Sequence, residues 1–142
     1  MEIIQWLAYP TREEILEGEE TVFPPEILGG MKSFKKLWRM AAGDEAMRLN
    51  LLKSMLGGLN EQMHGEEVNI ERGECYYYQP TTKTIRIPEK LSIISCLHEL
   101  GHHLKGASEL EACRFSVHLF KQCFPKAFAK LRWDGHMLVK SQ

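Results

Sequence analysis

The chain has 142 residues, of which 44% are hydrophobic, so it suits one domain spanning residues 1–142 that can bury a substantial core. Its formal net charge of −1 gives no electrostatic footprint for nucleic-acid binding at the level of the whole chain. No window of about 18 apolar residues predicts a membrane span, and no basic segment followed by an apolar stretch predicts a secretory signal at the N-terminus, so we expect a cytoplasmic protein.

The first 30 residues carry only short local signals. Thr11 suits a helix N-cap, and Glu14, three residues later, completes a capping box. The Pro24-Pro25 and Gly29-Gly30 pairs predict a turn or a short helical piece between them. We expect residues 1–30 either to wrap over the domain or to serve as a flexible arm.

Two helices are predicted in the next part of the chain. Met31–Met40 has apolar side chains on one face and basic residues on the rest, which we interpret as a solvated face rather than a patch for nucleic acid or a membrane. Gly43-Asp44 should end this helix and cap the next. Residues 45–63 carry apolar side chains at three- and four-residue steps, so they predict a core helix that ends or bends at Gly57-Gly58.

The hydrophobic pattern then changes to the two-residue period of strands. Three short segments alternate or are rich in tyrosine and isoleucine, and turn residues separate them. These segments are Glu67–Glu71, Cys75–Gln79 and Lys83–Pro88. We predict a three-stranded antiparallel meander that leads directly into a helix capped at Ser92 or a near neighbour.

This helix contains His98-Glu99-Leu100-Gly101-His102, a His-Glu-x-x-His pattern. Helical residues four apart project from one face, so His98 and His102 can share one Zn²⁺. Glu99 lies about 100° around the helix, where it can act as a base without ligating the metal. Leucines on the opposite side predict a core face, which leaves the histidine face to a cleft. The alternative is a helix with incidental histidines.

A second helix is predicted directly after this one. Gly106 suits the C-terminal end of the first helix and Ser108 the N-cap of the second. Apolar residues at three- and four-residue steps extend the second helix as far as Pro125, so it should pack back on the first. Residues 127–133 predict a further short helix, and Asp134-Gly135 predicts a turn.

A catalytic zinc normally takes three protein ligands and keeps one open position, so a third ligand must come from outside the first helix. Glu111 is one candidate, but it can instead be the capping-box partner of Ser108. Glu109 is a second candidate. His103 and His118 are weaker ones, because His103 points away from the pair and His118 lies two turns beyond Glu111.

The four cysteines, Cys75, Cys96, Cys113 and Cys123, contain no Cys-x-x-Cys pair. Without a secretory signal we expect them to be reduced thiols. Their spacings match no common cysteine-ligated zinc site.

The run His98–His102, followed by Glu111-Ala112-x-x-Phe115, resembles the ImmA/IrrE family of zinc metallopeptidase-like domains. The signature of that family is His-Glu-x-Gly-His and then Glu-Ala-x-x-Phe-Ala on the next helix. The resemblance covers about residues 66–124. Ser116 departs from it, the link from His102 to Glu111 is shorter than is common, and no helix-turn-helix accompanies the domain. SprT-like peptidases share the first motif but use a third histidine.

The resemblance implies an α+β, zincin-like fold with N-terminal helices, a three-stranded antiparallel sheet, an active-site helix and a packing helix. It implies that His98, His102 and Glu111 hold Zn²⁺ and that Glu99 is the catalytic base. The known activity of the family is cleavage of repressor-type regulators, often in phages and mobile elements, which does not by itself transfer to this chain.

We therefore expect a zinc metalloendopeptidase whose partner is a protein or peptide substrate. The substrate would add as a strand along an exposed sheet edge, for which Lys83–Ile87 is the candidate. Five residues are candidates for contacts with the substrate or the developing oxyanion: Tyr76, Tyr77, Tyr78, His118 and Arg114. One alternative is a zinc-binding interaction module with little turnover, and another is a structural zinc with four protein ligands.

Overall fold

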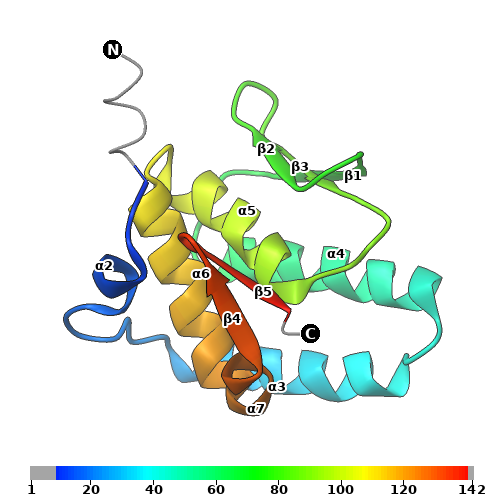
Figure 1. Ribbon diagram of the computed structural model, residues 1–142. Coiled ribbons are helices and arrows are strands. Elements are labelled where there is room, and N and C mark those ends of the chain that lie inside the picture. The colour runs from blue at the N-terminus through cyan, green and yellow to red at the C-terminus, as the bar shows by residue number, and fades with distance from the viewer. Residues whose placement is uncertain (1–8, 141–142) are drawn as a thin grey trace.

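The computed structural model describes residues 9–140 as a mixed arrangement of helices, a three-stranded sheet and a C-terminal hairpin (Figure 1). The helices are α2 (Arg12–Leu16), α3 (Pro25–Met40), α4 (Glu45–Gln62), α5 (Ile93–Lys105), α6 (Glu109–Cys123) and α7 (Pro125–Ala129). The strands are β1 (Asn69–Arg72), β2 (Tyr77–Gln79), β3 (Thr84–Ile87), β4 (Leu131–Asp134) and β5 (Met137–Lys140). None of the helices in residues 9–140 combines the length and apolarity needed to cross a membrane.

The N-terminal segment begins as predicted. Thr11 caps α2, and Glu14 completes the capping box by bonding back to the Thr11 backbone. Beyond α2 the chain lies along α6, whose His118 and Arg114 side chains form hydrogen bonds with the backbone of the N-terminal segment. The part of the predicted arm that is described therefore wraps over the domain, whereas residues 1–8 lie outside the described residues.

Helix α3 is longer than predicted, because it starts at Pro25 and continues through Gly29-Gly30. Proline is favoured in the first turn of a helix, but two interior glycines cost up to about 1 kcal/mol each. Ile27, Met31 and Phe34 form a buried stripe that extends across these glycines. Burial of three large apolar side chains, at roughly 1.5–3 kcal/mol each, outweighs that cost.

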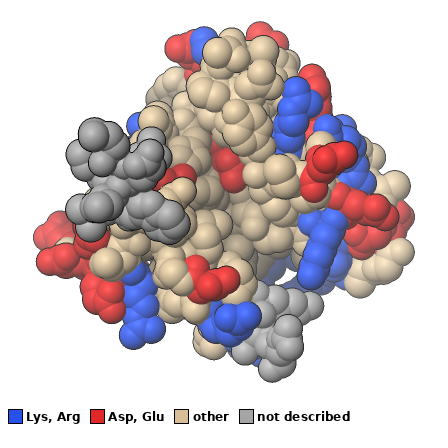
Figure 2. Space-filling view, turned by 45° about the horizontal axis from the view of Figure 1, so that its top comes forward, with Lys and Arg blue, Asp and Glu red and all other residues tan. Residues whose placement is uncertain are grey.

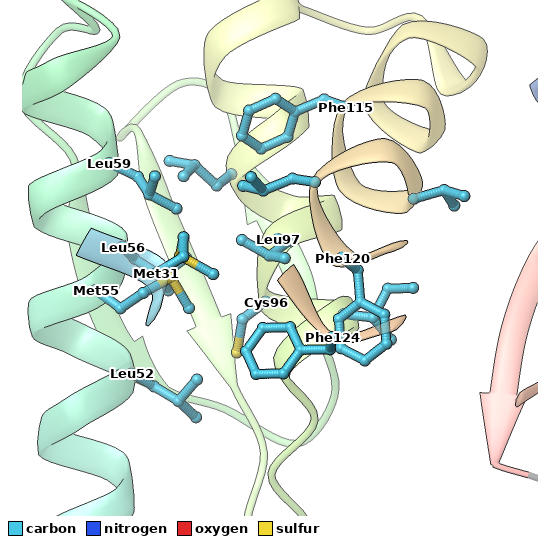
Figure 3. Packing of buried hydrophobic residues seen from close by; sticks show 14 of the residues in the cluster. Met31, Leu52, Met55, Leu56, Leu59, Cys96, Leu97, Phe115, Phe120 and Phe124 are labelled. Carbon is cyan, nitrogen blue, oxygen red and sulfur yellow. The ribbon is translucent and has the colours of Figure 1, made fainter. Parts of the chain in front are cut away.

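Helix α4 begins and ends close to the predicted bounds. Asp44 caps it by accepting a hydrogen bond from the Met47 amide, and the helix continues through Gly57-Gly58 without ending there. Its buried side chains are directed toward α5 and α6, where they meet Cys96, Leu97 and three phenylalanines of α6 and its C-cap (Figure 3). The apolar face of α5 thus completes the core, as its sequence pattern predicts.

The strand order of the sheet is β1-β3-β2, with β1 parallel and β2 antiparallel to β3. The predicted antiparallel meander is therefore wrong. Thr84, Ile85 and Ile87 of β3 are buried, so β3 has the most buried side chains of the three strands. It lies at the centre of the sheet, where a neighbouring strand covers each of its edges. The link after β1 crosses the end of β3, where the Gly73 amide donates to the Ile87 carbonyl at 3.1 Å. Lys83–Ile87 is thus not an exposed edge.

The C-terminal part also differs from the prediction of a short helix over 127–133. Helix α7 ends at Ala129, and β4 and β5 form an antiparallel hairpin. Its turn contains Gly135 at φ 63°, a conformation that glycine adopts without strain. Figure 1 shows the hairpin crossing α5 and α6, and Leu138 anchors it in the core.

Candidate metal centre

Helix α5 presents its two motif histidines on the side away from the core. Ser92 caps the helix by accepting a hydrogen bond from the Ser95 amide at 3.3 Å. Leu97 and Leu100 are fully buried, which fixes the rotation of the helix about its axis. The His98 and His102 rings consequently lie side by side, with centroids 4.9 Å apart and planes nearly perpendicular.

The carboxylate of Glu109 lies between these two rings. Its Oε1 is 2.5 Å from His102 Nε2, and its Oε2 is 3.4 Å from His98 Nε2. One ligand atom from each of the three residues lies within 4.8 Å of the others, the arrangement needed to hold one metal ion. Within the part of the chain that the structure describes, no other group of histidine, cysteine, aspartate and glutamate side chains meets this criterion.

The structure thus brings Glu109, and not Glu111, to the histidine pair. Ser108 caps α6, so Glu109 is its first residue, and the exposed Glu111 lies two residues further along. Two residues correspond to about 200° around a helix. Since Ala112 faces α5 and Glu109 precedes it by three residues, Glu109 shares that face and Glu111 points away. The grouping therefore favours Glu109, one of the two glutamates that the sequence had left open, over Glu111, which the resemblance implies.

A third imidazole, His136 at the tip of the β4–β5 hairpin, also reaches this carboxylate. Its Nε2 lies 3.2 Å from Glu109 Oε2, and its ring stacks on that of Tyr9 with centroids 4.8 Å apart. No motif in the sequence singles out His136. The only local signal was the preceding turn at Asp134-Gly135. The 26 residues between Glu109 and His136 carry no pattern that joins them.

The second nitrogen of each motif histidine has its own partner. His102 Nδ1 lies 3.0 Å from the Gly106 carbonyl oxygen, and His98 Nδ1 lies 3.7 Å from Cys113 Sγ. A carbonyl oxygen can only accept, so the His102 Nδ1 carries the proton of this hydrogen bond. In the neutral ring, the Nε2 lone pair is then directed at the space that Glu109 faces. Both rings therefore offer Nε2 to the space that Glu109 faces.

The charges in the centre depend on one another. Hydrogen bonds with His102 and His98 hold the pKa of Glu109 well below its usual range, and the bond to Glu109 raises the pKa of His102. Burial raises the pKa of Glu99, while the nearby imidazoles and the Tyr78 backbone oppose that rise. The centre thus pairs an ionised carboxylate with a second carboxyl group whose proton affinity is increased.

Tyr76 and Tyr78, predicted as substrate or oxyanion contacts, have other partners. The Tyr76 hydroxyl donates to the Lys90 carbonyl at 2.8 Å and accepts from the Ser92 amide at 2.6 Å, so it braces the start of α5. The Tyr78 hydroxyl lies 2.7 Å from His103 Nδ1, and His103 Nε2 lies 2.7 Å from the Glu66 carbonyl oxygen. His103 therefore links the sheet to α5 and is not part of the His98–His102–Glu109 cluster, the candidate metal group.

His118 and Arg114 tie the N-terminal segment to α6. His118 is 1% exposed, accepts from the Thr21 amide at its Nδ1 and donates from its Nε2 to the Ile15 carbonyl. The Arg114 guanidinium donates to four backbone carbonyls between residues 14 and 19. Neither side chain is free to contact a substrate in this arrangement.

Open space adjoins the centre on two sides. A cavity of about 10 Å³, room for one water molecule, is lined by His98, Cys113 and His136 among others. A wider groove of about 390 Å³ lies between residues 9–13 and the hairpin tip at Gly135-His136. The space-filling view shows a hollow in the face above α5 and α6, with an acidic side chain at its floor and mainly uncharged residues around it (Figure 2).

All four cysteines are free thiols, and they differ in burial. Cys96 and Cys113 are buried, which raises the pKa of each thiol to about 12. Of the two, Cys113 lies beside His98, and its raised pKa keeps the thiol protonated and uncharged.

Comparison of the chain with protein-family models, with curated proteins and with solved structures found no match.

Proposed function

We propose that the chain is a zinc-dependent metalloendopeptidase. The observation that carries this proposal is the convergence of His98, His102 and Glu109, with ligand atoms within 4.8 Å of one another, directly beside Glu99. Two imidazoles and one carboxylate are the protein ligands of a common class of catalytic zinc sites, in which the fourth position stays open for water. A zinc ion bound there would polarise a carbonyl group and lower the pKa of water.

The residues present suit such an ion for a second reason. Each motif histidine has a partner for Nδ1, so each can offer Nε2 as a ligand. Glu109 is ionised, because the neighbouring imidazoles lower its pKa. A divalent cation between this carboxylate and the rings would take the place of the proton that the short contact between Glu109 and His102 requires, so the donor set suits zinc.

Glu99 has the role of general base in this proposal. It is the residue after His98 on α5 and is 9% exposed, so it is close to the histidine pair and shielded from bulk water. It takes a proton from the attacking water and delivers that proton to the amine of the departing peptide. Its raised pKa increases its affinity for that proton during the transfer.

Strand β2 is a better candidate for substrate binding than β3, because within residues 9–140 it is an edge strand that pairs with β3 alone. It lies beside α5, and the Tyr78 backbone contributes to the environment of Glu99. An extended peptide pairing with the free edge of β2 would run past the histidine pair, with its backbone held by hydrogen bonds. A zincin-like fold and a repressor-type substrate, both implied by the ImmA/IrrE resemblance, are part of this proposal.

The second candidate is a zinc-binding interaction module with little turnover. The observation in its favour is an apolar groove of about 610 Å³ between α3 and α4, which is lined by residues such as Phe34, Leu37 and Met55 and by no histidine. In that case the metal centre would stabilise the fold while the groove binds a partner.

One experiment separates the two candidates. The purified chain is loaded with zinc and incubated with a mixture of unstructured peptides, and the fragments are identified by mass spectrometry. Glu99→Gln should keep the zinc content but abolish cleavage, whereas Glu111→Gln, an exposed control, should retain both. Cleavage that persists in Glu99→Gln would contradict the proposed mechanism, and an unaltered chain that binds zinc but cleaves nothing would favour the interaction module.

A further inference from the structure

The C-terminal hairpin is fixed against the helices that carry the metal group. Leu138 is 8% exposed and belongs to the hydrophobic core. The Cys113 thiol of α6 lies 3.8 Å from the His136 carbonyl oxygen, within reach of a weak hydrogen bond. The positive φ of Gly135 and the stacking of Tyr9 on the His136 ring define the tip further. The imidazole of His136 is therefore held in place and not carried on a loose end.

Glu109 needs a restraint of this kind. Its side chain is 25% exposed, and a glutamate at a helix start can adopt several rotamers, so ordering it costs conformational entropy. Its two oxygens are shared among three imidazoles, with Oε1 against His102 and Oε2 against both His98 and His136. A ligand to one oxygen and a donor to the other would fix both the direction and the tilt of the carboxylate.

We propose that His136 is a positioning residue of the metal centre. Its Nε2–H donates to Glu109 Oε2 and holds the carboxylate against His98 and His102, so that the hairpin sets the metal affinity of a site built on α5 and α6. This inference rests on the proposed metal site but not on catalysis. His136 is not one of the three residues whose ligand atoms lie within 4.8 Å of one another, which favours a role through Glu109 over direct ligation.

The test measures zinc affinity by competition with a chromophoric chelator, and it measures the melting temperature of the zinc-free chain. His136→Ala should weaken zinc binding by about 10–100-fold, the usual effect of removing a hydrogen-bond partner of a metal ligand. His136→Gln should recover most of the loss, because its amide can donate to Oε2. Arg132→Ala, an exposed position on the same hairpin, should bind zinc as the unaltered chain does. The zinc-free melting temperatures should agree among the variants.

Three outcomes would overturn the inference. Unchanged affinity in His136→Ala would show that Glu109 needs no such donor. A loss that His136→Gln does not recover, together with a change in the cobalt absorption spectrum that indicates one ligand fewer, would make His136 a direct ligand. Failure of the unaltered chain to bind zinc would remove the metal site itself, whereas loss of the proposed peptidase activity alone would leave the role of His136 intact.

Discussion

Gly101 of α5 lies directly against Ala112 of α6, where a Cβ added to the glycine would be 2.9 Å from the Ala112 carbonyl oxygen and 3.0 Å from its Cα. The two helices therefore approach each other as closely as their backbones permit at this point. Gly101 is the residue before His102, and Ala112 lies three residues after Glu109. The close crossing thus sets the distance between the histidine pair and the carboxylate.

We predict that Gly101→Ala weakens zinc binding and destabilises the fold by about 1–3 kcal/mol, the usual cost of overpacking. The clash is with backbone atoms, so α6 must move as a whole and Glu109 moves with it. Gly58→Ala is the matched control, because that glycine lies within a helix and nothing is within 4 Å of the added Cβ. The control should gain up to about 1 kcal/mol. Urea denaturation and zinc titration check both variants, and wild-type affinity in Gly101→Ala would contradict the close-packing argument.

Zinc content should distinguish the two glutamates at the start of α6. Glu109→Ala removes the carboxylate that contacts both motif histidines, so we expect the purified variant to lose most of its zinc. Glu111→Ala alters an exposed residue and should keep the zinc content of the unaltered chain. Measurement of metal content by mass spectrometry after dialysis decides the matter, and the reverse result would restore Glu111 as the third ligand.

Arg114→Lys should loosen the N-terminal segment. The guanidinium donates to four carbonyls at distances of 2.7–3.1 Å, and a lysine ammonium with three donors cannot reproduce this planar arrangement. We expect a loss of about 1–3 kcal/mol and faster proteolysis within residues 17–22. Arg39→Lys, an exposed site on α3, is the control. Equal proteolysis of both variants would show that Arg114 does not hold the segment.

His118 predicts a dependence of stability on pH. Burial lowers the pKa of this imidazole below its ordinary value of 6.5. At a pH between the folded-state and unfolded-state pKa values, the unfolded chain therefore binds more protons than the folded chain. The free energy of unfolding should therefore be fully retained above pH 6.5 and fall as the pH drops below it. The His118 imidazole must be neutral in the folded chain because its Nδ1 accepts a hydrogen bond from the Thr21 amide.

The measurement compares the unaltered chain with His118→Asn, whose side chain can still accept at the Nδ1 position. Urea denaturation at pH 8 and pH 5 gives the difference in unfolding free energy between the two chains. This difference should shrink at pH 5, because the variant lacks the group that must stay neutral. The comparison cancels the contribution of His102, whose raised pKa has the opposite sign. A difference independent of pH would rule out titration of His118 as the cause.

The sequence alone determined the features that depend on neighbours within one or two turns. The caps at Thr11, Asp44, Ser92 and Ser108 were readable because each side chain bonds to the amide three residues further along the chain. The pairing of His98 with His102 was readable for the same reason, because helical geometry places residues four apart on one face. The apolar side of α5 was equally a matter of local periodicity.

Only the tertiary structure decided which strand lies at the centre, which glutamate meets the histidines and whether a third imidazole joins them. The central place of β3 depends on burial from both sides, and the choice of Glu109 depends on the rotation of α6 that the Gly101–Ala112 crossing imposes. His136 reaches Glu109 only because Leu138 anchors the hairpin in a core built from distant segments. Such contacts join residues far apart in the chain, and no periodicity or cap in a single segment encodes them.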